Sequence, residues 1–253
     1  MPESRPRRVI IMPAHNESKN IAAVLRELRP WAQDADIVVI DDYSSDETAA
    51  LAAKMGAQVL SLPCNLRYGG AVQTGFKYAV QRGYDVAVMM DADGQHDPSA
   101  IPALLEAVES GQADVALGSR FLGRADYHLS LVRRWTMRAF AALVSRATRH
   151  PITDPTSGFQ ALNRDVLRFL ARDNYPVDFP DADLLMLLGF AGFRIQEVPM
   201  VVRSRMSGTS MHAGLKPIYY MLKMMLSILI VWLRQKTRSN AVRPAPAEPS
   251  DDA

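Results

Sequence analysis

Short apolar runs alternate with amphipathic stretches along the first half of the chain. The runs have the length of buried strands and lie at residues 9–12, 37–40, 58–60, 86–90 and 115–117. The stretches between them repeat apolar side chains at helical spacing, at residues 18–29, 46–55, 69–81 and 101–109. This alternation of strands and helices predicts an α/β fold with a mostly parallel, Rossmann-like sheet flanked by helices.

The second half of the chain has a different pattern. Residues 129–149 predict an arginine-rich helix, with Trp135, Phe140, Leu143 and Val144 on its apolar side. A polar turn, an unassigned segment, a helix and a strand are expected next, at 153–158, 159–170, 181–189 and 194–202.

Residues 215–234 are strongly apolar, but polar residues interrupt them too often for a typical transmembrane span of about 20 apolar residues. In a helix the polar side chains share one narrow stripe, formed by Lys216, Lys223, Ser227 and Arg234. This pattern favours an amphipathic helix on the membrane surface, or one that docks on a small integral membrane partner. A core or homo-oligomer helix and a short transmembrane helix are the alternatives.

These patterns divide the chain into four parts. We expect one folded domain over 8–212 and a membrane-proximal helix with a basic end over 213–238. Residues 1–7 and 239–253 lack apolar periodicity, and we expect flexible tails there.

The composition, with 48% hydrophobic and 22% charged residues in 253, is typical of a globular protein. The single Cys64 excludes an internal disulfide framework and a cysteine-based zinc cluster, and it favours a reducing compartment. The apolar run after the first arginines is too short for a secretory signal core. We therefore expect a peripheral protein on the cytoplasmic face of the cell membrane.

The net charge of +2 hides two opposed halves. Residues 1–119 hold 10 basic and 16 acidic residues, whereas residues 120–238 hold 18 basic and 8 acidic ones. The near-neutral sum argues against a nucleic-acid-binding protein of the histone type, and no nucleic acid is expected as a partner. The basic second half is suited instead to phosphate groups and an anionic membrane surface.

Polar side chains follow three of the predicted strands where each strand ends. They form the segments His15-Asn16-Glu17, Asp41-Asp42 and Asp91-Ala92-Asp93. In parallel sheets, ligands bind beyond the carboxyl ends of the strands, so this coincidence predicts a site. Asp91 and Asp93 can face one cation, and their oxygens suit Mg²⁺ or Mn²⁺, which would hold the phosphates of a nucleotide. A solvated turn is the alternative.

The other polar motifs carry less information by themselves. Asp41 and Asp42 could accept hydrogen bonds from a ribose or a base, or one of them could cap a helix, although Asp46 suits that role better. Gly69-Gly70 could form a phosphate cradle or a simple turn. His96 could bind metal or have a structural role. The absence of GxGxxG and P-loop motifs argues against a dehydrogenase or a P-loop kinase.

Taken in order, the motifs resemble those of family 2 glycosyltransferases with the GT-A fold. The most similar branch contains dolichol-phosphate mannose synthases and bacterial polyprenyl-phosphate glycosyltransferases. The resemblance spans about 8–234 and rests on the segments 13–17, 41–46, Asn65 with 69–70, 91–96, 118–121, 154–159 and 197–199, followed by Arg205 and Gly208.

The resemblance implies roles for individual residues. The nucleotide pocket would be formed by Pro13, His15, Glu17, Ile40 and Asp42, together with Asp91 and Arg205. Metal and diphosphate would be held by Asp91, Asp93 and Gln95. Phosphates of donor or acceptor would meet Arg120, Arg133 and Arg205, with Arg138 a weaker candidate. Asp154 is the leading base or orienting residue, with a purely turn-forming role before Pro155 as the alternative. Asp181 and Asp183 are further candidates, although they suit helix N-termini better. The catalytic set is Asp93, Asp154, Arg120 and Arg133.

The implied reaction moves a hexose, with inversion, from a nucleotide-diphosphate sugar to a polyprenyl phosphate. GDP-mannose, UDP-glucose and UDP-GlcNAc are donors of this kind. A phosphate dianion needs no general base, because its second pKa is about 6. A hydroxyl acceptor on a polysaccharide or glycolipid is one alternative, and a non-catalytic nucleotide-sugar-binding partner in a membrane complex is another. The chain has His15 and Tyr43 where the family often has Tyr and Gly, and it lacks the lysine that many members carry near Met211.

Overall fold

The computed structural model describes residues 5–122, 131–172, 175 and 182–203, and the side chains of 131–137 are outside this description. Contacts between residues divide the chain into Met1–Met211 and His212–Ala253, and every described residue lies in the first unit. The membrane-proximal segment expected over 213–238 and the tail over 239–253 therefore lie outside the described residues. None of the described helices combines the length and apolarity needed to cross a membrane.

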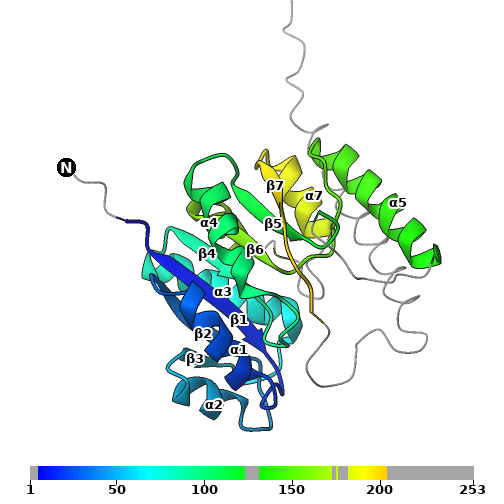
Figure 1. The fold of residues 1–253 in the computed structure, drawn as a ribbon. Helices are drawn as coiled ribbons and strands as arrows, with labels where there is room; N and C mark the ends of the chain where they lie inside the picture. The colour runs from blue at the N-terminus through cyan, green and yellow to red at the C-terminus, as the bar shows by residue number, and fades with distance from the viewer. Residues whose placement is uncertain (1–4, 123–130, 173–174, 176–181, 204–253) are drawn as a thin grey trace, which may run out of the picture. The chain divides into compact units, whose positions relative to one another are not determined.

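The fold is a seven-stranded mixed sheet flanked by helices (Figure 1). Its strands, in chain order, are β1 (Arg8–Ala14), β2 (Ala35–Asp41), β3 (Gln58–Ser61), β4 (Val86–Met89), β5 (Val115–Ser119), β6 (Gln160–Asn163) and β7 (Ile195–Pro199). Across the sheet the order is β3-β2-β1-β4-β6-β5-β7. All neighbouring strands are parallel except at β6, which runs antiparallel to β4 and to β5.

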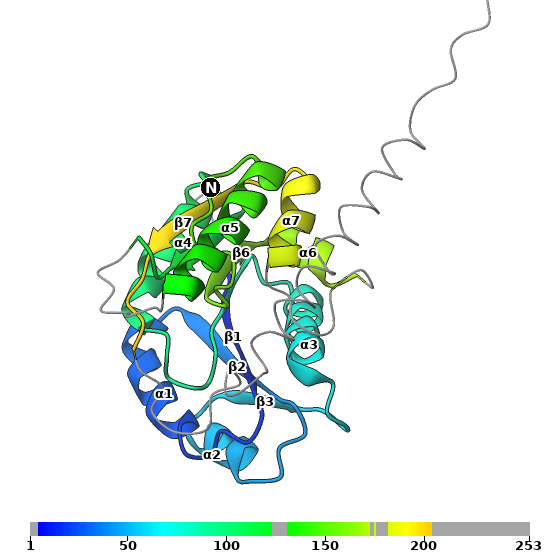
Figure 2. The ribbon, with the colours of Figure 1, turned by 90° about the vertical axis from the view of Figure 1, so that its right-hand side faces the viewer.

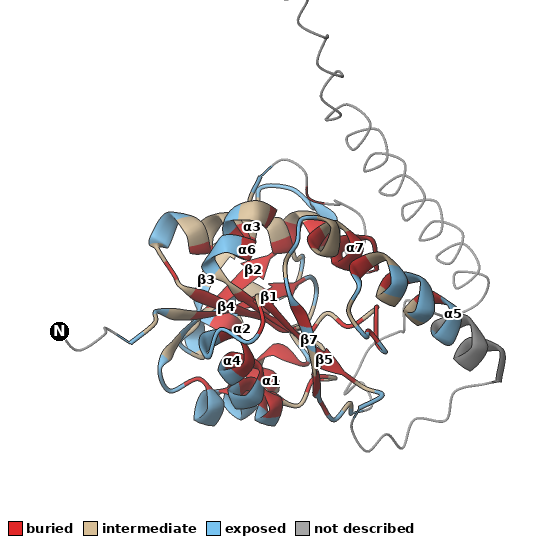
Figure 3. Cartoon of the chain, turned by 90° about the horizontal axis from the view of Figure 1, so that it is seen from above, coloured by how far each residue is buried: buried red, intermediate tan, exposed pale blue. Residues whose placement is uncertain are grey.

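Helices cover both faces of the sheet. They are α1 (Ile21–Leu28), α2 (Thr48–Lys54), α3 (Arg67–Arg82), α4 (Ile101–Glu109), α5 (Leu131–Thr148), α6 (Arg164–Leu170) and α7 (Ala182–Phe190), with short 3-10 helices η1 (Arg29–Trp31) and η2 (Pro98–Ala100). Figures 2 and 3 show α1 and α4 on one side of the strands and α3 and α6 on the other. The β-strands between these layers carry the buried core, drawn red in Figure 3.

The apolar periodicity explains how the helices pack. Ile21, Val24, Leu25 and Leu28 of α1 are all buried, and they belong to the same core cluster as Ile10 of β1. On the other face, α3 packs closely on β1 and β2 at Gly75. A Cβ there would lie 2.3 Å from a methyl group of Ile11, so only glycine permits this approach.

The first five predicted strands are confirmed, but the expected order of repeated βαβ units ends at β4. Residues 159–170, which the sequence left unassigned, form β6 and then α6, whose first turn is capped by Asn163 through the N–H of Val166. β6 inserts between β4 and β5, so these two strands are not neighbours. Two antiparallel pairings in succession leave β5 parallel to β4, and the carboxyl ends of both strands reach the same edge of the sheet.

Candidate active site

The ends of β1 and β2 lie side by side at this edge. Pro13 and Ile40 are paired in register and both are buried. The backbone N–H of Asp42 donates to the carbonyl of Ala14, which joins the two loops just beyond the strands. Three of the predicted nucleotide-pocket residues are therefore brought together by the pairing of two adjacent strands.

His15 is fixed by hydrogen bonds on both ring nitrogens. Its Nδ1 lies 2.8 Å from the carbonyl oxygen of Asp42, and its Nε2 lies 3.1 Å from Nδ2 of Asn16. The Asn16 amide has a defined orientation because its Oδ1 accepts from the N–H of Ser45 at 2.8 Å. Nδ2 of Asn16 must then donate to Nε2 of His15, which leaves Nδ1–H of the neutral ring to donate to Asp42. Nδ2 of Asn65 lies 3.3 Å from both Nδ1 and the Asp42 carbonyl oxygen, and with this tautomer it donates to the carbonyl.

Asp42 also connects to the segment before α3. Its Oδ1 accepts from the N–H of Leu66 at 2.6 Å, and Nδ2 of Asn65 lies 3.3 Å from its carbonyl oxygen. The side chain is buried, with 3% of Asp42 exposed. Glu17, the remaining predicted residue of this pocket, is half-buried at the entrance to α1 and accepts from Nδ2 of Asn20 at 2.6 Å.

Backbone strain is concentrated in these loops. Asn16, Tyr43 and Arg67 have φ values of 56°, 60° and 62°, in the left-handed region that favours glycine. Asn adopts this region readily, but for Tyr43 and Arg67 the conformation costs about 1–2 kcal/mol each. Three such residues lie in the connected loops around Asp42, and strained backbone is typical of functional sites.

Asp91, which follows β4, is held from two sides. Its Oδ1 accepts from the hydroxyl of Tyr68 at 2.9 Å, and its backbone N–H donates to Nδ1 of His96 at 3.3 Å. The His96 ring is buried and stacks on Phe159 with its centroid 5.0 Å away. Gly158 lies beside the carboxylate, where a Cβ would come within 3.3 Å of Oδ2. The glycine therefore leaves space next to Asp91, and this geometry favours a structural role for His96.

Asp93 and Gln95 lie in the same short loop. Oδ1 of Asp93 accepts from the N–H of Gln95 at 3.0 Å, and Gly94 between them has a φ of 78°. Within the described ranges, no group of three or more His, Cys, Asp or Glu side chains forms a complete metal site. A divalent ion would fit here only if Asp91 and Asp93 shared it with other oxygen donors, such as the Gln95 amide and the phosphates of a ligand.

The loop that contains Gln95 is also tied to the chain after β7. Val202 forms a bridge with His96, and the N–H of Arg203 donates to the carbonyl of Gln95 at 3.0 Å. The Arg203 guanidinium donates to Glu27 at 2.6 Å and to Asp97 at 3.0 Å. Partial burial tends to raise the pKa of Asp97, but bonds from Ser99 and Arg203 outweigh it and lower the pKa below its ordinary value.

Arg120 and Asp154 form a paired unit at the end of β5. Nε and Nη2 of Arg120 donate to the two carboxylate oxygens of Asp154 at 2.6 and 2.5 Å, and the N–H of Arg120 adds a bond of 3.0 Å. Asp154 is fully buried, while 23% of the Arg120 side chain remains exposed. Nη2 of Arg120 also donates to Thr156 at 2.6 Å. This geometry suits Asp154 to holding the guanidinium.

The turn from Asp154 to Gly158 links the Arg120–Asp154 pair to Asp91. Asp154 and Thr156 bind Arg120, while Gly158 lies against Asp91 and Tyr68. Because this turn leads directly into the antiparallel strand β6, it arrives at the edge where β4 and β5 end. The sequence predicted both motifs but gave no sign that one turn contacts them both.

The remaining predicted residues are placed less completely. Arg133 lies in α5, but its side chain is not among those described, and Arg205 and Asp181 lie outside the described residues. Arg138 is exposed on α5. Asp183 is buried in the first turn of α7 and accepts from the N–H of Leu184 at 2.9 Å, as expected for a helix N-terminal carboxylate.

Sequence reasoning gave no role to Tyr68, Thr156 or Glu197. Tyr68 had a weak signal, because it directly precedes Gly69-Gly70 where α3 begins. These glycines lie within the first turns of α3, which begins at Arg67. Asp46 was expected to cap the helix, but the residue at the cap position of α2 is Glu47, whose side chain makes no capping bond. Oδ1 of Asp46, one residue earlier, accepts from the N–H of Thr48 at 3.0 Å and so stabilises the start of the helix.

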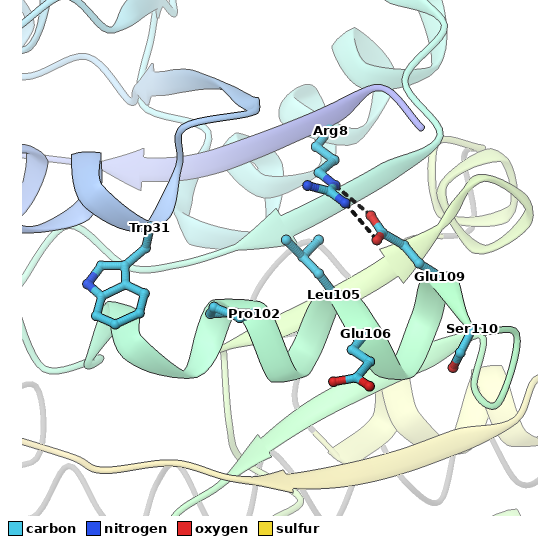
Figure 4. Close-up of a pocket in the computed structure, with 7 residues that line it drawn as sticks. All are labelled: Arg8, Trp31, Pro102, Leu105, Glu106, Glu109 and Ser110. Atoms are coloured by element: carbon cyan, nitrogen blue, oxygen red, sulfur yellow. Dashed lines mark hydrogen bonds and ion pairs between the residues drawn. The ribbon is translucent and has the colours of Figure 1, made fainter. Parts of the chain in front are cut away.

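A separate hollow of about 480 Å³ lies along α4, where this helix faces Arg8 of β1 and Trp31 (Figure 4). It is lined by Arg8, Trp31, Pro102, Leu105, Glu106, Glu109 and Ser110. Arg8 faces Glu109 there and donates to both of its carboxylate oxygens at 2.6 and 2.8 Å. None of the predicted site residues lines this hollow.

The fold and the paired strand ends define a GT-A-type α/β protein. The structure of glucosyl-3-phosphoglycerate synthase from Mycobacterium tuberculosis, crystallised with Mn²⁺, UDP-glucose and phosphoglyceric acid, has a similar fold. It superposes with a TM-score of 0.69 at 19% identity, over 90% of this chain and 80% of that one.

The chain belongs to glycosyl transferase family 2, whose model matches residues 9–170. It is 32% identical to the polyprenol monophosphomannose synthase of Mycolicibacterium smegmatis, over 82% of each chain. It is 33% identical to the undecaprenyl-phosphate mannosyltransferase of Micrococcus luteus, over 81% of this chain and 86% of that one. The protein is therefore a glycosyltransferase, as the ordered motifs predicted.

Proposed function

We propose that the protein transfers a hexose, with inversion, from a nucleotide-diphosphate sugar to a polyprenyl phosphate. The observation that carries the proposal is the turn from Asp154 to Gly158, which binds Arg120 through Asp154 and Thr156 and places Gly158 beside Asp91. One turn thus supports Asp91, a proposed ligand of the metal ion that would hold the donor diphosphate, and Arg120, whose guanidinium suits an acceptor phosphate. The names of the two relatives agree with a polyprenyl-phosphate acceptor and make mannose the first sugar to test.

On the donor side, the base and ribose would lie against the ends of β1 and β2. Pro13 and Ile40 supply the buried floor, and Asp42 and Glu17 supply hydrogen-bond acceptors. Asn16 fixes the tautomer and orientation of the His15 ring, which would contact the base or ribose of the donor. Arg205 is proposed to reach the diphosphate.

A divalent ion, Mg²⁺ or Mn²⁺, would be held by Asp91, Asp93 and Gln95. When bound, it supplies a Lewis acid that stabilises the negative charge on the departing nucleoside diphosphate. The protein's own part is to hold the carboxylates in place: Tyr68 restrains Asp91, and the N–H of Gln95 restrains Asp93. Gly158 keeps the space beside Asp91 free of a side chain.

On the acceptor side, Arg120 and Arg133 would position the phosphate. An acceptor phosphate dianion attacks the anomeric carbon without a general base, so it requires mainly orientation and charge compensation. Asp154 is fully buried and bound to Arg120 through both oxygens, so we assign it the orienting role and not that of a base.

The acceptor lipid requires work at a membrane surface. We propose that the amphipathic segment 213–238 provides this contact, on the cytoplasmic face where the nucleotide sugar is available. Flotation with liposomes containing anionic lipid, for the full chain and for a chain truncated after residue 212, tests this assignment. Equal binding of the two chains to the liposomes would exclude it.

The function is tested by incubating the full chain with undecaprenyl phosphate, MnCl₂ or MgCl₂, and a panel of GDP- and UDP-sugars, followed by mass spectrometry of the lipid extract. Asp93→Ala should abolish transfer while leaving the melting temperature nearly unchanged. Asp34→Ala, an exposed carboxylate at the other end of the sheet, is the matched control. Product only on a glycolipid or polysaccharide hydroxyl would overturn the assigned acceptor, and normal turnover by Asp93→Ala would overturn the metal assignment.

A further inference from the structure

Glu197 of β7 binds the turn that carries Asp154. Its Oε1 accepts from the backbone N–H groups of Thr153 and Asp154 at 2.8 and 2.7 Å. Its Oε2 accepts from the hydroxyl of Thr153 at 2.7 Å. One carboxylate therefore makes three hydrogen bonds to two consecutive residues, which fixes the start of the turn.

The Glu197 carboxylate also gives direction to a chain of hydrogen bonds. Because Thr153 donates its only hydroxyl proton to Glu197, the 2.8 Å contact between Thr153 and Ser119 must have Ser119 as the donor. The Ser119 oxygen in turn accepts from the N–H of Phe121 at 3.3 Å. The hydrogen-bond chain thus runs from Phe121 through Ser119 and Thr153 to Glu197. It includes the residues directly before and after Arg120 in the sequence.

We infer that Glu197 is a positioning residue for Arg120, and that it controls transfer through the turn at Thr153 and Asp154. Two paths from Glu197 converge on Arg120. One runs through the backbone of Asp154, whose buried carboxylate holds the guanidinium, and the other runs through Ser119, the residue before Arg120. The pairing of β5 with β7 fixes the position of Glu197 relative to Arg120, because Glu197 lies opposite Leu117 and Arg120 directly follows β5.

An isosteric amide at position 197 separates this role from simple packing. In Glu197→Gln the amide oxygen still accepts both backbone N–H groups, but Nε2 can only donate to Thr153. The Thr153 hydroxyl must then turn toward Ser119, which loses its acceptor. Ser119 is fully buried, and an unpaired buried hydroxyl is costly. The shape of the site is retained while the direction of the hydrogen-bond chain is lost.

The inference rests on the proposed function of Arg120, and kinetics with the full chain test it. We expect Arg120→Ala to lower kcat/KM for the acceptor at least 100-fold, as for loss of a transition-state donor. Glu197→Ala should lower it about 10- to 100-fold, the range known for outer partners of metal ligands, and Glu197→Gln about 10-fold. In the Arg120→Ala background, Glu197→Ala should have almost no further effect on kcat/KM.

Asp114→Asn is the matched control, because Asp114 also accepts several bonds from one arginine, Arg194, at the opposite end of β5. It should lower the melting temperature without changing KM. Effects of Arg120→Ala and Glu197→Ala that multiply, or a Glu197→Ala variant that changes stability only, would overturn the inference.

A second measurement does not depend on which acceptor is used. The Nε–H of Arg120, bound to buried Asp154, should give a protected arginine signal in ¹H–¹⁵N spectra, assigned by its absence in Arg120→Lys. Glu197→Ala should broaden or expose this signal, whereas Asp114→Asn should leave it unchanged. Use of a hydroxyl acceptor by the wild-type protein would refute the proposed function. The Arg120 signal would still test the coupling of Glu197 to Arg120, because it does not depend on the acceptor. An unchanged signal in Glu197→Ala would overturn the inference.

Discussion

The hydroxyl of Tyr68, in the first turn of α3, donates a hydrogen bond of 2.9 Å to the carboxylate of Asp91 at the end of β4. A helix on one face of the sheet thereby restrains a carboxylate at its edge. The bond favours one orientation of the carboxylate before any ligand arrives, which reduces the cost of organising the site on binding.

Replacing Tyr68 by Phe removes this bond and keeps the ring. We expect the metal concentration for half-maximal transfer to rise about 10-fold, the lower end of the effect seen for outer partners of metal ligands. Titration of activity with MnCl₂ measures it. Tyr78→Phe, on the same helix and bound to Gln58 at 2.6 Å, is the control. The role of Tyr68 would be refuted by equal metal titrations for the two variants.

The tautomer of His15 is a second prediction. The neutral ring should carry its proton on Nδ1, because Asp42 accepts there and Asn16 donates to Nε2. Long-range ¹H–¹⁵N spectra distinguish the two nitrogens. Asn16→Ala should reduce the preference for this tautomer about fivefold, for a hydrogen bond of about 1 kcal/mol. A proton found on Nε2 in the wild-type protein would contradict the assignment.

Arg203→Ala should affect the loop that contains Gln95. It removes the cation shared by Glu27 and Asp97, and we expect a loss of about 1 kcal/mol in unfolding free energy, typical of partly exposed ion pairs. Because the same loop carries the proposed metal ligands, the KM for the nucleotide sugar should rise several-fold. Arg8→Ala breaks a bidentate pair at the far end of the sheet and should lower stability alone. A KM shifted equally by both substitutions would count against the link to the loop.

Asp46 should contribute to stability in a defined pH range. Partial desolvation tends to raise the pKa of Asp46, but hydrogen bonds from Thr48 and Ser18 outweigh it and lower the pKa from 3.8 to about 2. Since the folded-state pKa is the lower one, the stabilisation is present above about 3.8 and is lost as the pH falls through about 2. Urea unfolding of the wild type and Asp46→Ala should differ by about 1–2 kcal/mol at pH 7, after allowance for solvent screening, and by much less near pH 2. A difference independent of pH would exclude a role for the ionised carboxylate.

The sequence predicted those parts of the site that follow from local pattern. Continuous apolar runs located β1, β2 and β4, and parallel strands place their carboxyl ends together, so the proximity of His15 to Asp42 could be expected. The loops after these strands carry the motifs of the family. The fold class followed from the alternation of apolar runs and amphipathic stretches and did not depend on any single motif.

The parts of the fold and of the site that the sequence did not predict depend on contacts between residues distant in sequence. β6 is only four residues long and has no alternating pattern, so neither its direction nor its position between β4 and β5 could be inferred. The pairing of Arg120 with Asp154 follows from that position. The same is true of Glu197, whose partners at Thr153 and Asp154 meet it only when β7 lies beside β5. Asp154 alone could therefore be interpreted equally well as a base or orienting residue or as a residue that only forms the turn before Pro155.

The antiparallel strand β6 also sets the order in which the molecule can be assembled. β1, β2, β3 and β4 can pair as soon as the first ninety or so residues have left the ribosome. β5 is synthesised next, but it pairs only with β6 and β7, so it has no place in the sheet until those later strands are made. Contacts of such long sequence separation close slowly. A nascent chain would thus complete the half that carries the proposed nucleotide pocket early, and the half that carries Arg120 and Asp154 would close last, when almost all of the folded domain has been made.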